Sequence, residues 1–168
     1  MALVAASPAA AAELQPWTSP EPPTLTLPSL AGDAVDLSAV CGRVVLVHFF
    51  ATWCEPCREE IASLERLAAL ADAPRILAVS VGEVPARVRT FFGERPPSFP
   101  VLFDTDRRAM KDFSVLGLPT TFVLDPGLRL ARRVEGDLDW TLPATLAELT
   151  RIEAAAAPAC EQRQLQGG

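Results

Sequence analysis

The chain has 168 residues, 49% of them hydrophobic, and a formal net charge of -6 at pH 7. This length supports one well-buried core rather than two independent ones, so we expect a single domain. The acidic balance, with no stretch rich in lysine and arginine, argues against nucleic acid and anionic membranes as partners. The sequence contains no run of about 18 apolar residues, the pattern that a transmembrane helix requires.

Residues 1–23 form an arm rich in alanine and proline. The arm lacks the basic start and the strongly apolar centre of a signal peptide, so two origins stay open: the end of a signal peptide, or a linker that followed an anchor. Such a composition buries too little apolar surface to order itself, and we expect the arm to be flexible. The folded domain is expected over residues 24–157, followed by a C-terminal tail over residues 158–168.

The first predicted elements are a hairpin, a buried strand and a helix. Two short extended runs in residues 24–37 flank Gly32-Asp33, a turn pair typical of hairpins. Residues 44–50 are almost all β-branched or aromatic, which indicates a strand buried on both faces. In residues 56–71 apolar side chains recur every three or four positions, which predicts an amphipathic helix whose polar face includes Glu60.

The rest of the chain continues the alternation of strands and helices. In chain order we expect a strand at 75–81, a helix at 85–93, a strand at 101–103, a short helix after Asp106, strands at 120–124 and 128–134, and a helix at 142–155. The Asp125-Pro126-Gly127 turn predicts that the last two strands are antiparallel. This order indicates an α/β fold with a mixed central sheet flanked by helices.

Four cysteines are present, and only Cys54 and Cys57 have the spacing of a motif. The pair follows the buried strand and opens the amphipathic helix, with Pro56 in the first turn, where proline is tolerated. The dipole and unpaired amides at a helix start stabilise a thiolate and lower the pKa of the first cysteine, and the second lies one turn away. A thiolate attacks a disulfide and a neighbouring thiol resolves the mixed intermediate, so the pattern predicts redox chemistry.

A Cys-x-x-Cys pair is also half of a tetrahedral zinc site. A second pair at comparable spacing is absent from the sequence, and His48, Cys41 and Cys160 are the only other candidate ligands. We therefore favour a redox dithiol over structural zinc, and we predict neither a metal nor a cofactor.

Four runs of residues resemble a known family. They are FFATWCEPCREE at 49–60, VGE at 81–83, FPV at 99–101 and GLPTTF at 117–122. In order and spacing they are similar to the TlpA/ResA/CcmG branch of the thioredoxin superfamily, over about residues 25–155. The resemblance implies a thioredoxin-like fold with an added N-terminal β-hairpin. It also implies an extracytoplasmic location, such as the periplasm, often with a membrane tether.

The resemblance assigns roles around the dithiol. Cys54 matches the exposed attacking cysteine, and Cys57 matches the more buried resolving one. Pro119 matches the cis-proline that faces the dithiol and leaves the backbone of Leu118 free to pair with an extended substrate; an ordinary trans turn is the alternative. The exposed aromatic Trp53 is expected to guard the nucleophile and contact substrate, with plain packing as the alternative.

Further residues beside the motif have weaker assignments. Glu55 and Pro56, between the cysteines, are expected to contact substrate. Glu83 matches an acidic residue near the dithiol, where partial burial should raise the pKa of the carboxyl and let it relay the Cys57 proton; a solvent-facing side chain is the alternative. His48, six residues before the first cysteine, is either a satisfied core residue or a group that tunes proton transfer near neutral pH.

Cys41 and Cys160 flank elements that can approach each other. Their pairing would close a loop of more than 100 residues and stabilise the fold by about 4 kcal/mol in the chain-entropy model. Two free thiols are the alternative, because the sequence does not show whether the Cα atoms come within bridging range.

Three functional classes are compatible with these features. The resemblance favours a reductant of protein disulfides of the cytochrome c maturation or copper-site assembly type, re-reduced by a membrane dithiol reductase and acting as a monomer. A dithiol oxidase or isomerase is the first alternative, although the helical insertion and the histidine between the cysteines that are usual in that class are lacking. The second alternative is a metallochaperone, which generally wants a further soft ligand after Cys57.

Overall fold

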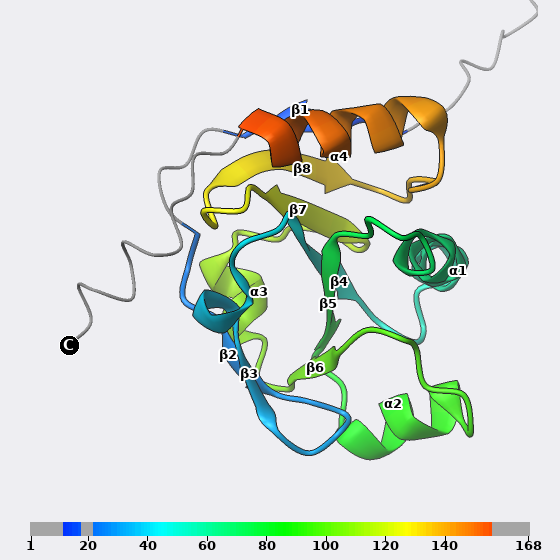
Figure 1. Ribbon diagram of the computed structural model, residues 1–168. Coiled ribbons are helices and arrows are strands. Elements are labelled where there is room, and N and C mark those ends of the chain that lie inside the picture. The colour runs from blue at the N-terminus through cyan, green and yellow to red at the C-terminus, as the bar shows by residue number, and fades with distance from the viewer. Residues whose placement is uncertain (1–11, 18–21, 156–168) are drawn as a thin grey trace, which may run out of the picture.

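The computed structural model describes residues 12–17 and 22–155 of the chain, and a six-stranded mixed sheet runs through its centre (Figure 1). The strands are β1 (Gln15–Pro16), β4 (Val45–Phe50), β5 (Arg75–Val81), β6 (Val101–Asp104), β7 (Thr120–Leu124) and β8 (Leu130–Glu135). Their order across the sheet is β1-β8-β7-β4-β5-β6. β4, β5 and β6 are parallel, whereas β7, β8 and β1 each pair antiparallel. The predicted mixed α/β sheet is therefore confirmed.

Helices cover both faces of the sheet. α1 (Glu55–Ala68), α2 (Pro85–Phe92) and α4 (Pro143–Ala155) pack on one face, and α3 (Arg108–Asp112) and the 3-10 helix η1 (Leu37–Val40) pack on the other. The position of β4 between these two layers explains why its sequence is apolar at almost every position. Val45, Val47 and Phe49 contribute to the core on the α3 side, while Leu46 and Phe50 contribute to the core beneath α1. A strand covered on both faces loses the alternation of polar and apolar residues.

The N-terminal hairpin lies against the outer edge of the sheet. β2 (Thr26–Pro28) pairs antiparallel with β3 (Ala34–Asp36), and Gly32 takes the positive φ of 105° that the turn between them requires. The backbone amide of Leu30 donates a hydrogen bond to the carbonyl of Val101 on β6 (2.7 Å), and Ser29 forms a bridge with Leu102. The predicted added hairpin is confirmed, and it covers the otherwise unpaired side of β6.

The opposite edge of the sheet differs from the expectation for residues 1–23. Gln15 and Pro16, placed in the flexible arm by the sequence analysis, form β1 and pair with Arg133 and Arg132 of β8. Trp17 follows them and packs edge-on against Phe122, with ring centres 6.3 Å apart. Burial against an aromatic ring supplies the apolar contact that composition alone did not predict.

The helices of the described residues include none that is long and apolar enough to cross a bilayer.

Candidate active site

The dithiol lies where β4 ends and α1 begins, at one end of the sheet. Cys54 has an extended backbone (φ −86°, ψ 108°) and is the N-cap residue of α1, so the unpaired amides of the first helical turn face its side chain. Glu55 and Pro56 occupy the first two helical positions, both exposed. Proline costs no hydrogen bond there. The helix start predicted from Pro56 is thus confirmed to within one residue.

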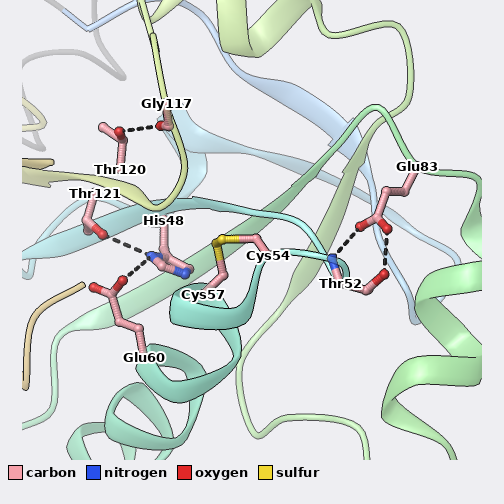
Figure 2. Close-up of a disulfide and its surroundings, with 9 residues drawn as sticks. All are labelled: His48, Thr52, Cys54, Cys57, Glu60, Glu83, Gly117, Thr120 and Thr121. Carbon is pink, nitrogen blue, oxygen red and sulfur yellow. Dashed lines mark hydrogen bonds and ion pairs between the residues drawn. A yellow bond between two sulfur atoms is a disulfide. The ribbon is translucent and has the colours of Figure 1, made fainter. Parts of the chain in front are cut away.

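Cys54 and Cys57 are joined by a disulfide, with Cα atoms 5.3 Å apart (Figure 2). Cys54 keeps 7% of its surface exposed and Cys57 none. The side chain of Trp53, directly before Cys54, is 68% exposed. An incoming sulfur atom therefore reaches Cys54 and not Cys57, the order in which the sequence analysis assigned the attacking and resolving roles.

A loop after α3 brings a proline to the same end of the sheet. The peptide bond between Leu118 and Pro119 is cis, as the family resemblance implies. The Thr120 hydroxyl donates a hydrogen bond to the carbonyl of Gly117 (2.8 Å), and the carbonyl of Pro119 accepts one from the amide of Gly136 (2.9 Å). These bonds fasten both sides of the cis bond, while Leu118 stays half-exposed beside it.

Glu83 is buried and forms hydrogen bonds with the turn that precedes the dithiol. Its carboxylate accepts hydrogen bonds from the amide (2.9 Å) and the hydroxyl (2.5 Å) of Thr52, and from the hydroxyl of Ser80 (2.9 Å). Only 4% of Glu83 is exposed, so the solvent-facing alternative is wrong. Its contacts go to Thr52, two residues before Cys54, and Figure 2 shows them on the far side of the disulfide from Glu60.

His48 is fully buried on β4 (Figure 2). Its Nδ1 shares a hydrogen bond with the hydroxyl of Thr121 (2.9 Å) and lies 4.0 Å from a carboxyl oxygen of Glu60. Burial away from water lowers the pKa of the imidazole to about 3. The ring is therefore neutral at physiological pH and does not itself titrate there, which limits any tuning role to that of a neutral hydrogen-bonding group.

Glu60 is a candidate site residue that the sequence analysis missed. The helical pattern predicts that it lies on the polar face, but it is 2% exposed, and its Oε1 accepts a 2.6 Å hydrogen bond from the indole of Trp140. Burial raises the pKa of this carboxyl to about 8. The available signal was spacing: Glu60 is three residues after Cys57 and four before Leu64, so all three share one helix face.

Trp140 and its neighbours hold Glu60 in place from the segment before α4. The amide of Trp140 donates a hydrogen bond to the hydroxyl of Ser63 on α1 (2.7 Å), and the indole ring is fully buried. The carboxyl oxygen Oε2 of Glu60 and the Nε2 atom of His48 have no hydrogen-bond partner among the described residues. Glu60, within one helical turn of Cys57, and His48, 4.0 Å from Glu60, thus each have a buried polar atom with unused hydrogen-bonding capacity.

Cys160 lies outside the described residues, so its disulfide with Cys41 stays a prediction. Within residues 12–17 and 22–155, no three His, Cys, Asp or Glu side chains come together in a way that would hold a metal ion.

The parallel strands, the covering helices and the dithiol at a helix start define a protein of the thioredoxin-like class. The model of the AhpC/TSA family matches residues 20–132, and the chain belongs to that family.

Named relatives agree with this assignment. The chain is 33% identical to thiol-disulfide oxidoreductase ResA of Bacillus subtilis over 118 residues, and 36% identical to thioredoxin-like protein YneN of the same species over 107. The aligned regions cover 69% and 61% of this chain and 66% and 62% of those relatives, so the chain spans less than two thirds of the length of each.

Solved structures show the same fold. A protein assigned as thiol:disulfide interchange protein DsbE from Chlorobium tepidum is 28% identical, with a TM-score of 0.68 over 81% of this chain and 94% of that one. StoA from Bacillus subtilis is 20% identical, with a TM-score of 0.64 over 79% and 99%.

Proposed function

We propose that the protein is a thiol:disulfide oxidoreductase that reduces disulfides of protein clients. The observation that carries this proposal is the asymmetry of the pair: Cys54 is at the helix start and reachable, and Cys57 is one turn inside and closed off. Two relatives, named thiol-disulfide oxidoreductase ResA and thioredoxin-like protein YneN, support the same class of reaction.

The reaction follows from the positions of the two sulfur atoms. The Cys54 thiolate attacks one sulfur of the client disulfide, forms a mixed disulfide and releases the other client sulfur as a thiolate, which takes a proton. The Cys57 thiol then loses its proton and attacks the Sγ of Cys54. The second client sulfur leaves as a thiol, and the two electrons given to the client leave Cys54 and Cys57 joined, the oxidised form seen here.

The second step needs a buried acceptor for the Cys57 proton. Glu60 shares a helix face with Cys57, and its carboxyl has a pKa of about 8. Its ionised form accepts the Cys57 proton, and because the fraction in this form grows as the pH rises towards 8, the second step should become faster over that range. His48, neutral and 4.0 Å from Glu60, has a ring nitrogen without a partner and extends this path. We assign Glu83, the relay expected from the resemblance, mainly to holding the turn through Thr52, with a lesser share in proton transfer.

Client binding is assigned to the apolar rim around Cys54. We define this rim as Trp53, Val84, Leu116 and Leu118, which come from three loops at the dithiol end of the sheet. Trp53, Val84 and Leu116 are 68%, 58% and 88% exposed, whereas most large apolar side chains of the described residues are buried. Exposed apolar residues gathered in this way indicate a binding surface, here for an extended client segment that pairs with the backbone of Leu118.

The proposal also includes the location of the protein, its electron donor and its oligomeric state. We assign the protein an extracytoplasmic location, an upstream dithiol reductase in the membrane as its electron donor, and action as a monomer, because the TlpA/ResA/CcmG resemblance implies these properties.

Two measurements test the reductant function. Equilibration with glutathione buffers should give a midpoint more reducing than glutathione itself, and the reduced protein should reduce insulin. A midpoint well above that of glutathione would instead favour the dithiol oxidase alternative.

The residue roles are tested by trapping. Cys57→Ser should accumulate mixed disulfides with client proteins in the native host, because the first attack remains and the resolving thiol is gone. Cys54→Ser, the matched variant, should accumulate none. Equal trapping by both variants would contradict the assigned roles.

A further inference from the structure

The loop between α3 and β7, residues 114–118, carries two residues of the apolar rim and is tied to the opposite edge of the sheet. It leaves α3 at Ser114, whose backbone has a positive φ of 54°. Val115 is buried, and Leu116 beyond it is 88% exposed. A segment that projects an apolar side chain so far into water needs a fixed base if it is to keep one conformation.

Arg133 of β8 supplies that base. Its Nη2 donates a hydrogen bond to the carbonyl of Ser114 (3.3 Å), and it also pairs with the carboxylate of Glu135. The residue is only 8% exposed, which is unusual for an arginine on a strand near the sheet edge. A planar guanidinium presents donors in several directions, so one side chain serves both acceptors.

Aromatic rings hold the guanidinium in this orientation. Its central carbon lies 4.8 Å from the ring centre of Trp17 and 5.5 Å from that of Phe122. Trp17 also packs edge-on against Phe122. Trp17 is kept there by β1, because the preceding Gln15 pairs with Arg133 itself. The chain of contacts therefore runs from the N-terminal strand through Arg133 to the loop beside the dithiol.

We propose that Trp17 and Arg133 are positioning residues for client binding. They touch neither the dithiol nor a client; they fix the base of residues 114–118 so that Leu116 and the backbone of Leu118 present one surface to an extended peptide. The proposal rests on the proposed function, since it concerns the binding step of that reaction. It gives the N-terminal strand a role in client affinity, which no part of the dithiol chemistry requires.

The test compares two neighbouring arginines. Arg133→Lys keeps the charge but loses the planar donor set, and Arg132→Lys makes the same change on the opposite side of β8, where Arg132 pairs with Glu148 (2.6 Å). For Arg133→Lys the KM for insulin should rise about threefold to tenfold, the effect of one lost hydrogen bond, with kcat nearly unchanged. The reaction of the dithiol with oxidised glutathione, which needs no extended surface, should stay the same.

A second pair of variants avoids the risk of misfolding at a buried arginine. Trp17→Ala removes the ring above the guanidinium and should raise the KM for insulin in the same way, whereas Trp17→Phe keeps an aromatic face and should restore most of the affinity. Amide hydrogen exchange of residues 115–118 should become faster in Arg133→Lys and Trp17→Ala and stay unchanged in Arg132→Lys.

The outcomes separate the positioning role from the proposed function. Unchanged exchange in residues 115–118, or equal losses of rate with insulin and glutathione, would overturn the positioning role while leaving the dithiol chemistry intact. A wild-type protein that reduces neither substrate would overturn the proposed function, and hydrogen exchange would still decide whether Arg133 and Trp17 fix the loop.

Discussion

Two titratable groups of the site lie buried together, and burial moves their pKa values in opposite directions. The pKa of Glu60 rises to about 8 and that of His48 falls to about 3, so both side chains are neutral between these values. A neutral pair needs no counter-charge in a medium that solvates ions poorly. The site therefore stores a proton on Glu60 without the large cost of a buried ion.

Glu60→Gln should change the pH dependence of stability in a definite direction. An unfolded glutamate loses its proton near pH 4.5, whereas folded Glu60 keeps its proton up to about pH 8. Between these values the folded state binds more protons, so stability falls as pH rises, by at most about 1.4 kcal/mol per pH unit. The variant, which cannot titrate, should lose this slope, so it gains stability relative to the wild type from pH 5 to pH 8.

Urea unfolding of the oxidised proteins at pH 5, 6.5 and 8 measures the effect, because the disulfide keeps the two thiols from titrating. Glu59→Gln, an exposed neighbour on the same helix, is the control and should run parallel to the wild type. Parallel curves for Glu60→Gln as well would contradict the raised pKa.

The two thiols of the reduced protein should differ in reactivity. Cys54 lies at the positive end of α1 and reaches solvent, so iodoacetamide should modify it at lower pH and faster than the closed-off Cys57. Mass spectrometry of peptides after labelling from pH 5 to pH 9 reports both sites. If Cys57 were modified first, the attacking and resolving roles would be reversed.

For individual residues, the sequence identifies those that form a motif and misses those that tertiary packing brings to the site. Cys54 and Cys57 follow from spacing and from the strand before them. The sequence places Glu60 on the solvent face because charged residues are seldom buried, and the partners that make its burial tolerable, the indole of Trp140 and the backbone of Leu138, come from about 80 residues further along the chain.

Among the elements, the turn between β4 and α1 depends on a carboxylate from the end of β5. The amide and the hydroxyl of Thr52 both donate hydrogen bonds to the carboxylate of Glu83. The hydrogen bond from the hydroxyl has no backbone counterpart in the turn. The position of Cys54 at the helix start thus depends on one residue in the loop that follows the neighbouring strand.

Thr52→Val should lower the free energy of unfolding by about 1.5 to 3 kcal/mol, because the buried Glu83 loses a charge-assisted hydrogen bond. Thr90→Val is the matched control: its hydroxyl bonds the carbonyl of Ala86 on the exposed face of α2 (3.0 Å), and we expect a much smaller loss. Chemical unfolding of both variants provides the comparison. Equal losses would show that Glu83 does not depend on Thr52.

Elements with strong local patterns were predicted well. The expected bounds of β5 and β7 agree with the structure, because a buried strand is a continuous apolar run between polar or turn residues. β1 and η1 were missed. β1 has two residues and exists only through its pairing with β8, and η1 depends on Asp36, whose carboxylate accepts a hydrogen bond from the amide of Ser38 (2.8 Å).

For the molecule as a whole, the N-terminal hairpin belongs to the core and is not an appendage. Leu25, just before β2, is 2% exposed and lies in the same cluster as Val47 and Phe49 of the central strand. The core on the α3 side would therefore be incomplete without the hairpin. Its removal would expose apolar surface of the sheet as well as the edge of β6.

Leu25→Ala should destabilise the fold by about 2 to 5 kcal/mol, the usual effect of a cavity in a close-packed core. Leu70→Ala, which changes a side chain that is 45% exposed, is the control and should cost much less. Urea unfolding followed by circular dichroism should show one shifted transition. Two separate transitions in Leu25→Ala would indicate that the hairpin folds independently of the sheet.

The two edges of the sheet also bear on whether a client polypeptide can pair with the protein as an added strand. An unfolded polypeptide aggregates by adding strands to an open sheet edge. Here one edge is covered by the hairpin on β6, and the other ends in β1, two residues long, where Pro16 has no amide proton to donate. In the part of the chain described here, a client thus finds little sheet edge to extend, and its binding would be confined to the apolar rim and to the sulfur–sulfur bond with Cys54.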